Sequence, residues 1–213
     1  MWWPKNPLIG AAGRFIVIFG LLVLPWPGWN AAYSGYFRAL GQAVFGHQDE
    51  QRIVRFVPYH EQHGFSSLDT QMTLGNRALA DSTGKGKAES VTLDTRSIGW
   101  VPTALTMALI LATPVPWRQR AWALLWGLLL IHAFILFSLQ TWIWYASPDL
   151  SLLTLSPFTK SIVDGLEYTL LTQLGASFSV PMLIWILVTI RRENLFSFSP
   201  PQAQSKSKPS QAR

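Results

Sequence analysis

Long apolar stretches alternate with polar segments along this chain and predict its organisation. The apolar stretches cover roughly residues 8–26, 98–115, 121–145 and 166–190. Each is close to the about 20 residues that an α-helix needs to cross the hydrocarbon of a bilayer. We therefore predict an α-helical integral membrane protein with four transmembrane helices, the first of them a retained anchor.

Basic residues flank these stretches on alternating sides. They are Lys5 and Arg14, then Arg118 and Arg120, then Arg191 and Arg192. Basic residues beside membrane helices favour the cytoplasmic side. This pattern predicts that both termini lie in the cytoplasm and that the residues between the first two helices are exported.

A segment of helical periodicity follows the first apolar stretch. Within residues 30–50, aromatic and aliphatic residues recur at helical spacing at Tyr33, Tyr36, Phe37, Leu40 and Val44. The spacing predicts an amphipathic helix that lies in the membrane interface. The alternative is that this segment extends the first transmembrane helix beyond a proline kink.

Residues 51–97 change to the period of a β-strand. In the runs RIVRFVPY, SLDTQMTL and ESVTLDTR, β-branched and aromatic residues alternate with polar ones. This alternation predicts a small antiparallel sheet of three or four strands outside the cytoplasm. Because so small a domain buries little surface, we expect it to lean on the helices or on a partner, and its exposed face becomes the predicted interaction surface.

The predicted division of the chain follows from these patterns. It comprises a cytoplasmic flank with the first membrane helix (1–29), the interfacial helix (30–50), the β domain (51–97), a three-helix membrane bundle (98–192, with spans 98–115, 121–145 and 166–190) and a disordered basic tail (193–213).

Composition supports a membrane protein and narrows the chemistry. Of the 213 residues, 49% are hydrophobic and only 13% are charged, and the 11 tryptophans lie mostly near the ends of the apolar stretches. The net charge of +6 is concentrated beside those ends and in the tail, so nucleic acid is not an expected partner. The absence of cysteine excludes disulfides and thiolate chemistry.

Few residues have the types and spacing of a catalytic or metal site. The sequence His60-Glu61-Gln62-His63 lacks the spacing of a helical zinc site and would need a third ligand such as Asp69 or Asp94. We therefore expect neither a metal nor a cofactor. The weak catalytic candidates are His60, His63, Asp69, Asp94 and Arg96, all predicted near the outer headgroups.

Polar residues interrupt the later apolar stretches, and the ones we single out are His132, Gln140 and Gln173. Ionisable groups inside a membrane are often functional. Here we expect a neutral His132 that forms an interhelical hydrogen bond. No acidic residue lies deep in an apolar stretch, which disfavours a proton-coupled or cation-coupled transporter.

The segment RSIGWVPTALTMALILATP, with a short basic turn and a long helix after it, resembles part of the exosortase-associated bacterial membrane proteins. The matching positions are Gly99, Pro102, Ala108, Leu109, Leu111, Ala112, Thr113 and Pro114. The resemblance implies an accessory role in envelope protein sorting or surface-polymer export. Exosortases themselves use a membrane-embedded cysteine, which this chain lacks, so their activity is not implied.

The leading hypothesis is a non-enzymatic accessory or scaffold protein of the bacterial inner membrane. It would present its β domain to a membrane or periplasmic protein partner, with the lipid bilayer as its other partner. The alternative is a membrane-embedded enzyme that acts on a lipid-linked or peptide substrate at the outer interface.

Overall fold

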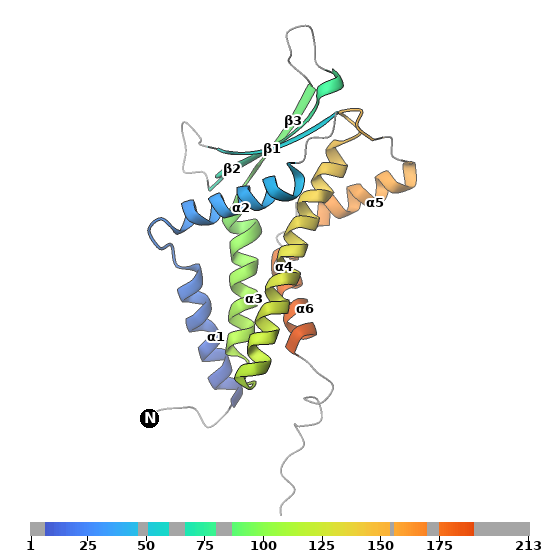
Figure 1. The fold of residues 1–213 in the computed structure, drawn as a ribbon. Helices are drawn as coiled ribbons and strands as arrows, with labels where there is room; N and C mark the ends of the chain where they lie inside the picture. Colours follow the sequence, from blue (N-terminus) through green and yellow to red (C-terminus); the bar gives the residue numbers. More distant parts are fainter. Residues whose placement is uncertain are drawn as a thin grey trace, which may run out of the picture.

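The computed structural model describes residues 7–46, 51–59, 67–79, 87–153, 156–169 and 175–189. Within these ranges the chain forms six α-helices and one three-stranded sheet. Figure 1 shows a bundle of helices with a layer above it, made of helix α2 and the sheet.

The bundle consists of four helices. They are α1 (Pro7–Val23), α3 (Val101–Ala112), α4 (Trp117–Ala146) and α6 (Gly175–Thr189). Helix α3 is central because it contacts the other three. It follows directly on a π-helical turn, η2 (Arg96–Trp100), and Pro102 lies in its first turn.

The prediction of four transmembrane helices is wrong. Among the described residues, only α4, with 30 residues, is long and apolar enough to cross a membrane by length and composition. The other apolar helices are shorter, at 17 residues or fewer, and cover Ile9–Val23, Arg96–Ala112 and Gly175–Thr189. A helix of 17 residues rises about 26 Å, less than the about 30 Å of a typical hydrocarbon core.

Two features make the apolar helices shorter than predicted: prolines that follow helix ends, and a helix that the sequence did not predict. Helix α1 ends two residues before Pro25, and α3 ends two residues before Pro114. In the predicted span 166–190, residues 166 and 167 belong to α5 (Pro157–Glu167), and the described part of the rest includes α6 (Gly175–Thr189). Ser156 starts α5 by accepting a hydrogen bond from the Thr159 backbone N–H at 3.2 Å.

Helix α2 (Trp29–Phe45) lies across the top of the bundle and beneath the sheet (Figure 1). Gly28 precedes it with a φ of 77°, a left-handed conformation that glycine adopts without strain. The chain therefore turns sharply here, and α2 is a helix separate from α1. Its buried residues are Tyr33, Ser34, Phe37, Gly41 and Phe45. In the predicted stripe, Tyr36 and Val44 are exposed instead.

The sheet is antiparallel, with strands β1 (Arg52–Pro58), β2 (Thr70–Asn76) and β3 (Lys87–Leu93) in that order. Alternate residues of β2, from Thr70 to Asn76, are buried, as the two-residue period predicts.

One hydrophobic core joins the sheet, α2 and the upper part of α4. Val54, Met72 and Leu74 come from the inner face of the sheet, and they share this core with Phe37 and Ile143. The small sheet therefore gains the buried surface that it could not provide alone.

Candidate functional site

The carboxylate of Asp69 fixes the start of β2 to the end of β3. Its Oδ2 accepts a 2.6 Å hydrogen bond from the Thr95 hydroxyl, and its Oδ1 accepts one from the Thr95 backbone N–H at 3.3 Å. Arg38 of α2 donates to the backbone oxygen of Asp69 at 3.3 Å and to the Thr70 hydroxyl at 3.2 Å. We call Arg38, Asp69, Thr70 and Thr95 the junction, because they join the sheet to α2 and to the entry of α3.

Asp94 and Arg96 satisfy backbone groups at helix ends. Asp94 Oδ1 accepts hydrogen bonds from the backbone N–H groups of Arg96 (3.0 Å) and Ser97 (3.2 Å), at the start of η2. Arg96 Nη2 donates to the carbonyl oxygen of Val23, the last residue of α1, at 2.7 Å. These bonds serve groups that a helix end leaves without intrahelical partners.

The catalytic candidates are therefore placed only in part. Asp69, Asp94 and Arg96 lie at the base of the sheet and make local structural bonds. His60 and His63 lie outside the described residues. Within the described part of the chain, no group of three or more histidine, aspartate or glutamate side chains could hold a metal ion.

The opposite side of the sheet, here called the outer face, points away from α2 and the bundle (Figure 1). Strand register places Arg55 beside Thr73 and Thr73 beside Ser90 on that face, with Gln71 and Thr92 in the next row. Helix α2 lies beneath the sheet on its other side (Figure 1). The outer face thus carries hydrogen-bonding groups and one arginine together with the apolar side chains of Ile53, Val57 and Ala88.

The sheet is also tied down at its far end and along β1. Asn76 donates from Nδ2 to the carbonyl oxygen of Leu150 at 2.8 Å, and Lys87 donates to the carbonyl oxygen of Asp149. Both acceptors lie in the segment that follows α4. Along β1, the N–H of Phe56 donates to Gln42 Oε1 of α2 at 3.2 Å. These bonds and the core give the outer face a fixed orientation on the bundle.

A buried tyrosine lies where α2 meets the start of α3. Burial raises the pKa of Tyr33 to about 12, while a hydrogen bond with Thr103 acts in the opposite direction. A Cβ atom at Gly99 would lie 2.5 Å from the Tyr33 hydroxyl oxygen, and the Trp100 ring lies 5.4 Å from the Tyr33 ring. Glycine is therefore required at residue 99 for this close approach.

Of the polar residues predicted inside the membrane, His132 forms its hydrogen bond within its own helix, not with another one. His132 Nδ1 donates to the Leu128 carbonyl oxygen of its own helix at 2.7 Å, since a carbonyl only accepts. The His132 ring also meets the edge of Tyr36 from α2 at 5.9 Å. Gln140 is half-buried in α4, and Gln173 lies outside the described residues.

The interior of the bundle combines large aliphatic residues such as Ile110 and Ile131 with many small and hydroxyl-bearing ones. The buried ones on α3 and α4 include Thr103, Ala104, Thr106, Ala108, Ala112, Ala123, Gly127, Ser138 and Thr141. The hydroxyls of the threonines and of Ser138 donate to carbonyl oxygens four residues earlier in the same helix. Small residues at helix contacts are typical of bundles that pack within lipid.

Large apolar residues lie on the outside of the same bundle. On α4 the exposed ones are Trp117, Trp122, Leu125, Trp126, Leu129, Leu130, Phe137, Trp144 and Tyr145, and α1 and α6 expose further aliphatic residues. Soluble monomers rarely expose continuous apolar surface of this extent. Together with the length of α4, this surface supports association with a membrane.

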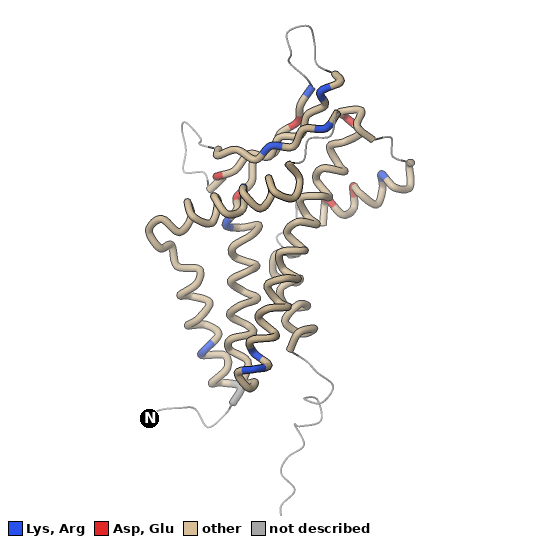
Figure 2. Tube along the Cα trace, in the orientation of Figure 1, with Lys and Arg blue, Asp and Glu red and all other residues tan. Residues whose placement is uncertain are grey.

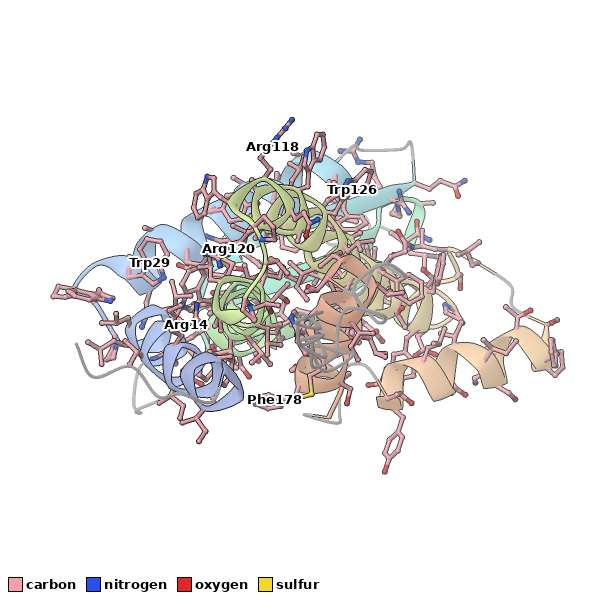
Figure 3. All side chains as sticks on the ribbon, turned by 90° about the horizontal axis from the view of Figure 1, so that it is seen from below. Arg14, Trp29, Arg118, Arg120, Trp126 and Phe178 are labelled. Atoms are coloured by element: carbon pink, nitrogen blue, oxygen red, sulfur yellow. The ribbon has the colours of Figure 1, made fainter. Side chains whose placement is uncertain are left out.

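The two ends of the molecule differ in acidic residues. Figure 2 shows basic residues at both ends, whereas the acidic residues of the described ranges lie toward the sheet end. The basic residues of α1 and α4, which are Arg14, Arg118 and Arg120, lie at the end of the bundle away from the sheet (Figures 2 and 3). Figure 3, viewed from this basic end, places Arg118 at the outer edge and Arg120 nearer the middle. Arg120 Nη2 donates to the carbonyl oxygens of Thr113 (3.1 Å) and Val115 (3.3 Å), which closes the turn between α3 and α4.

Comparisons with known proteins found no relative of this chain. No family model matches the chain, and no curated protein or solved structure is significantly similar to it.

Sequence reasoning missed several residues that join the elements. Arg38, Asn76 and Gln42 connect the sheet to α2 and to the segment after α4, and Trp185 Nε1 of α6 donates to the Thr113 hydroxyl at 2.8 Å. Arg38 lies off the apolar stripe of its helix, which is a usable signal for a polar contact. Nothing in the local pattern marks Asn76 or Thr113 as partners of residues more than 70 positions away.

Proposed function

We propose that this chain is a non-enzymatic accessory protein of a bacterial inner membrane that presents the outer face of its sheet to a protein partner. The observation that carries the proposal is the contrast between the two faces of the sheet. The inner face is fixed to α2 and α4 by a shared core and by bonds at both ends, and the outer face has no such attachment among the described elements.

The lipid bilayer is the first partner in this proposal. Its support is the exposed apolar surface of the bundle and the 30-residue α4, which rises about 45 Å and exceeds the hydrocarbon thickness. The apolar bundle is embedded in the bilayer, with α4 crossing it.

The orientation is proposed from the arginines. Cytoplasmic segments beside membrane helices are enriched in arginine and lysine, so the end with Arg14, Arg118 and Arg120 faces the cytoplasm. Helix α1 begins and α6 ends at this basic end, which supports cytoplasmic termini (Figure 1). The sheet then lies at the outer surface of the membrane.

The bonds of Asp69, Asp94 and Arg96 support a scaffold over an enzyme. A general base or acid needs a polar atom that can reach a substrate. The Asp69 carboxylate instead holds Thr95, Asp94 caps η2, and Arg96 caps α1.

The protein partner is proposed from the sequence resemblance to exosortase-associated membrane proteins. That resemblance supports a partner in envelope protein sorting or surface-polymer export, at the membrane or in the periplasm.

The absence of natural cysteine allows a direct test with single-cysteine variants. Thr73→Cys places a thiol on the outer face, Ser161→Cys places an exposed control on α5, and Gln119→Cys places one at the basic end. Spheroplasts of the native host are treated with a membrane-impermeant maleimide. We expect Thr73→Cys and Ser161→Cys to react and Gln119→Cys to stay unlabelled.

The same variants then carry a benzophenone maleimide for photocrosslinking. We expect the Thr73→Cys probe to form one discrete adduct that mass spectrometry identifies as an envelope-processing or export protein, and the Ser161→Cys probe to form none. Labelling of Gln119→Cys from outside contradicts the orientation. Equal adducts from Thr73→Cys and Ser161→Cys, or none, contradict the role of the outer face.

A further inference from the structure

A cavity of about 860 Å³ lies at the basic end, between the first turns of α4 and the last turn of α6. Its size falls within the about 300–1,000 Å³ that is usual for small-molecule sites. The residues that determine its chemistry are Arg118, Gln119, Trp126, Leu130, Leu187 and Thr189.

The lining of the cavity changes from polar to apolar along α4. Arg118 and Gln119 lie in the first turn of the helix, and Trp126 and Leu130 follow two to three turns further into the bundle. Residues 118 and 130 are separated by a rise of about 18 Å. A ligand that fills this space has a charged or polar end and an apolar end.

The polar end has unused hydrogen-bonding groups. Among the described residues, nothing accepts a hydrogen bond from the exposed Arg118 guanidinium, in contrast to Arg120, which is bound to two carbonyl oxygens. Thr189 Oγ1 is buried in the cavity wall and has no hydrogen-bond partner within the described ranges. A buried hydroxyl without a partner is costly, and because Thr189 lines the cavity, a ligand oxygen toward which its hydroxyl turns would satisfy it.

The charged residues around the cavity favour a ligand with a negative charge. The described residues at this end include three arginines and no carboxylate, and the first turn of α4 carries no acidic residue (Figure 2). The positive end of the helix dipole adds to the attraction for an anion. An arginine next to exposed tryptophans at a membrane interface matches the phosphate of a lipid headgroup beside its acyl chains.

We propose that this cavity binds one anionic phospholipid of the leaflet on the basic side. The phosphate lies against Arg118 and Gln119, a glycerol or ester oxygen accepts a hydrogen bond from Thr189, and an acyl chain lies along Trp126, Leu130 and Leu187. This inference rests on the proposed embedding of the bundle in a bilayer.

The test uses the full chain purified in a mild detergent and titrated with phosphatidylglycerol during native mass spectrometry. Phosphatidylcholine with the same acyl chains is the zwitterionic control. We expect phosphatidylglycerol to bind more tightly than phosphatidylcholine, and Arg118→Gln to weaken phosphatidylglycerol binding about fivefold. Arg118→Lys should keep most of the affinity, because it retains the charge.

Two matched variants separate this site from general attraction. Arg55→Gln removes an exposed arginine from the outer face of the sheet, and Trp144→Ala removes an exposed tryptophan from the other end of α4. Both should bind lipid like the wild-type chain, whereas Trp126→Ala should weaken the binding of both lipids. Equal affinity for the two lipids, or the same loss in Arg55→Gln and Arg118→Gln, overturns the proposal.

Membrane fractionation distinguishes a failure of the proposed membrane embedding from a failure of the proposed phospholipid site. If carbonate releases the wild-type chain from membranes, the proposed embedding is wrong. If the chain resists carbonate and yet binds both lipids equally, only the phospholipid site is wrong. Circular dichroism of each variant checks its fold, and the comparison of the two lipids on the wild-type chain stands without any variant.

Discussion

The sheet layer and the bundle differ most in what they leave exposed. The sheet covers large residues such as Met72 and Leu74 and turns polar residues such as Thr73 and Gln71 to its other face. The bundle buries small and hydroxyl-bearing residues beside large ones such as Ile131, and it also exposes large apolar residues such as Leu129 and Trp126.

This contrast teaches that one chain is adapted to two surroundings. In water, burial of large apolar groups stabilises a fold. Within lipid that driving force is absent between helices, and close packing of small residues takes its place. Exposure of a large apolar side chain is therefore unfavourable where the sheet layer meets water, but it is not unfavourable where α4 meets lipid.

The same substitution at two exposed apolar positions gives the largest expected difference. Leu129 on α4 is 57% exposed and Val57 on β1 is 38% exposed. A lysine near the middle of a membrane helix costs about 2.5–3.5 kcal/mol for insertion. We therefore expect Leu129→Lys to reduce the amount of carbonate-resistant protein several-fold, whereas Val57→Lys leaves it unchanged. A Leu129→Lys protein that inserts like the wild type would mean that this side of α4 faces water.

Two glycine substitutions compare the contact between the layers with the contact inside the bundle. At Gly99 an added methyl group meets the buried Tyr33 ring at 2.5–3.2 Å, and at Gly127 it meets the Ile110 Cδ1 atom at 2.6 Å. The aromatic ring is held on several sides, but the end of an isoleucine side chain can rotate away. We expect Gly99→Ala to lower the stability by about 1–3 kcal/mol and Gly127→Ala by clearly less.

The measurement is thermal unfolding in detergent, followed by circular dichroism. If Gly127→Ala lowers the midpoint as much as Gly99→Ala does, the bundle is packed as rigidly as the junction between the layers.

The smallest expected effect is a loss of stability at alkaline pH through Tyr33. Burial raises the pKa of Tyr33 to about 12, against about 10 in an unfolded chain, so the folded state keeps a proton that the unfolded state releases. The stability that this group contributes is present below pH 10 and is lost as the pH rises from 10 toward 12. Between pH 10 and pH 11 the wild type should lose about 1 kcal/mol more than Tyr33→Phe.

Absorbance at 295 nm gives an independent check, because the chain has only five tyrosines. The difference between the titrations of the wild type and Tyr33→Phe should be a single step near pH 12. A step near pH 10 would place the Tyr33 hydroxyl in water.

The local sequence pattern predicts the sheet and most of the helices. It does not predict that three of the apolar helices are too short to cross a membrane. Alternation over β2 and β3 depends on neighbours two residues apart, so it is readable from sequence. The apolar character of residues 166–190 does not show that residues 166 and 167 belong to α5, because that helix starts at Ser156-Pro157, outside the apolar stretch.

The contacts that orient the sheet could not be predicted in the same way. Asp69 and Asp94 stand out as acidic residues, and the pattern cannot distinguish a catalytic carboxylate from one that caps a backbone N–H group. The bonds from Arg96 to Val23 and from Asn76 to Leu150 join residues 73 and 74 positions apart, so they depend on the complete fold.

The turn that Arg120 closes also has a consequence for biosynthesis. Within the described ranges its guanidinium bonds to carbonyl oxygens five and seven positions earlier, so these bonds of the α3–α4 hairpin can form as soon as its own residues leave the ribosome. Trp185 reaches back 72 positions to the Thr113 hydroxyl beside that turn, so its helix docks last, onto a hairpin that is already folded.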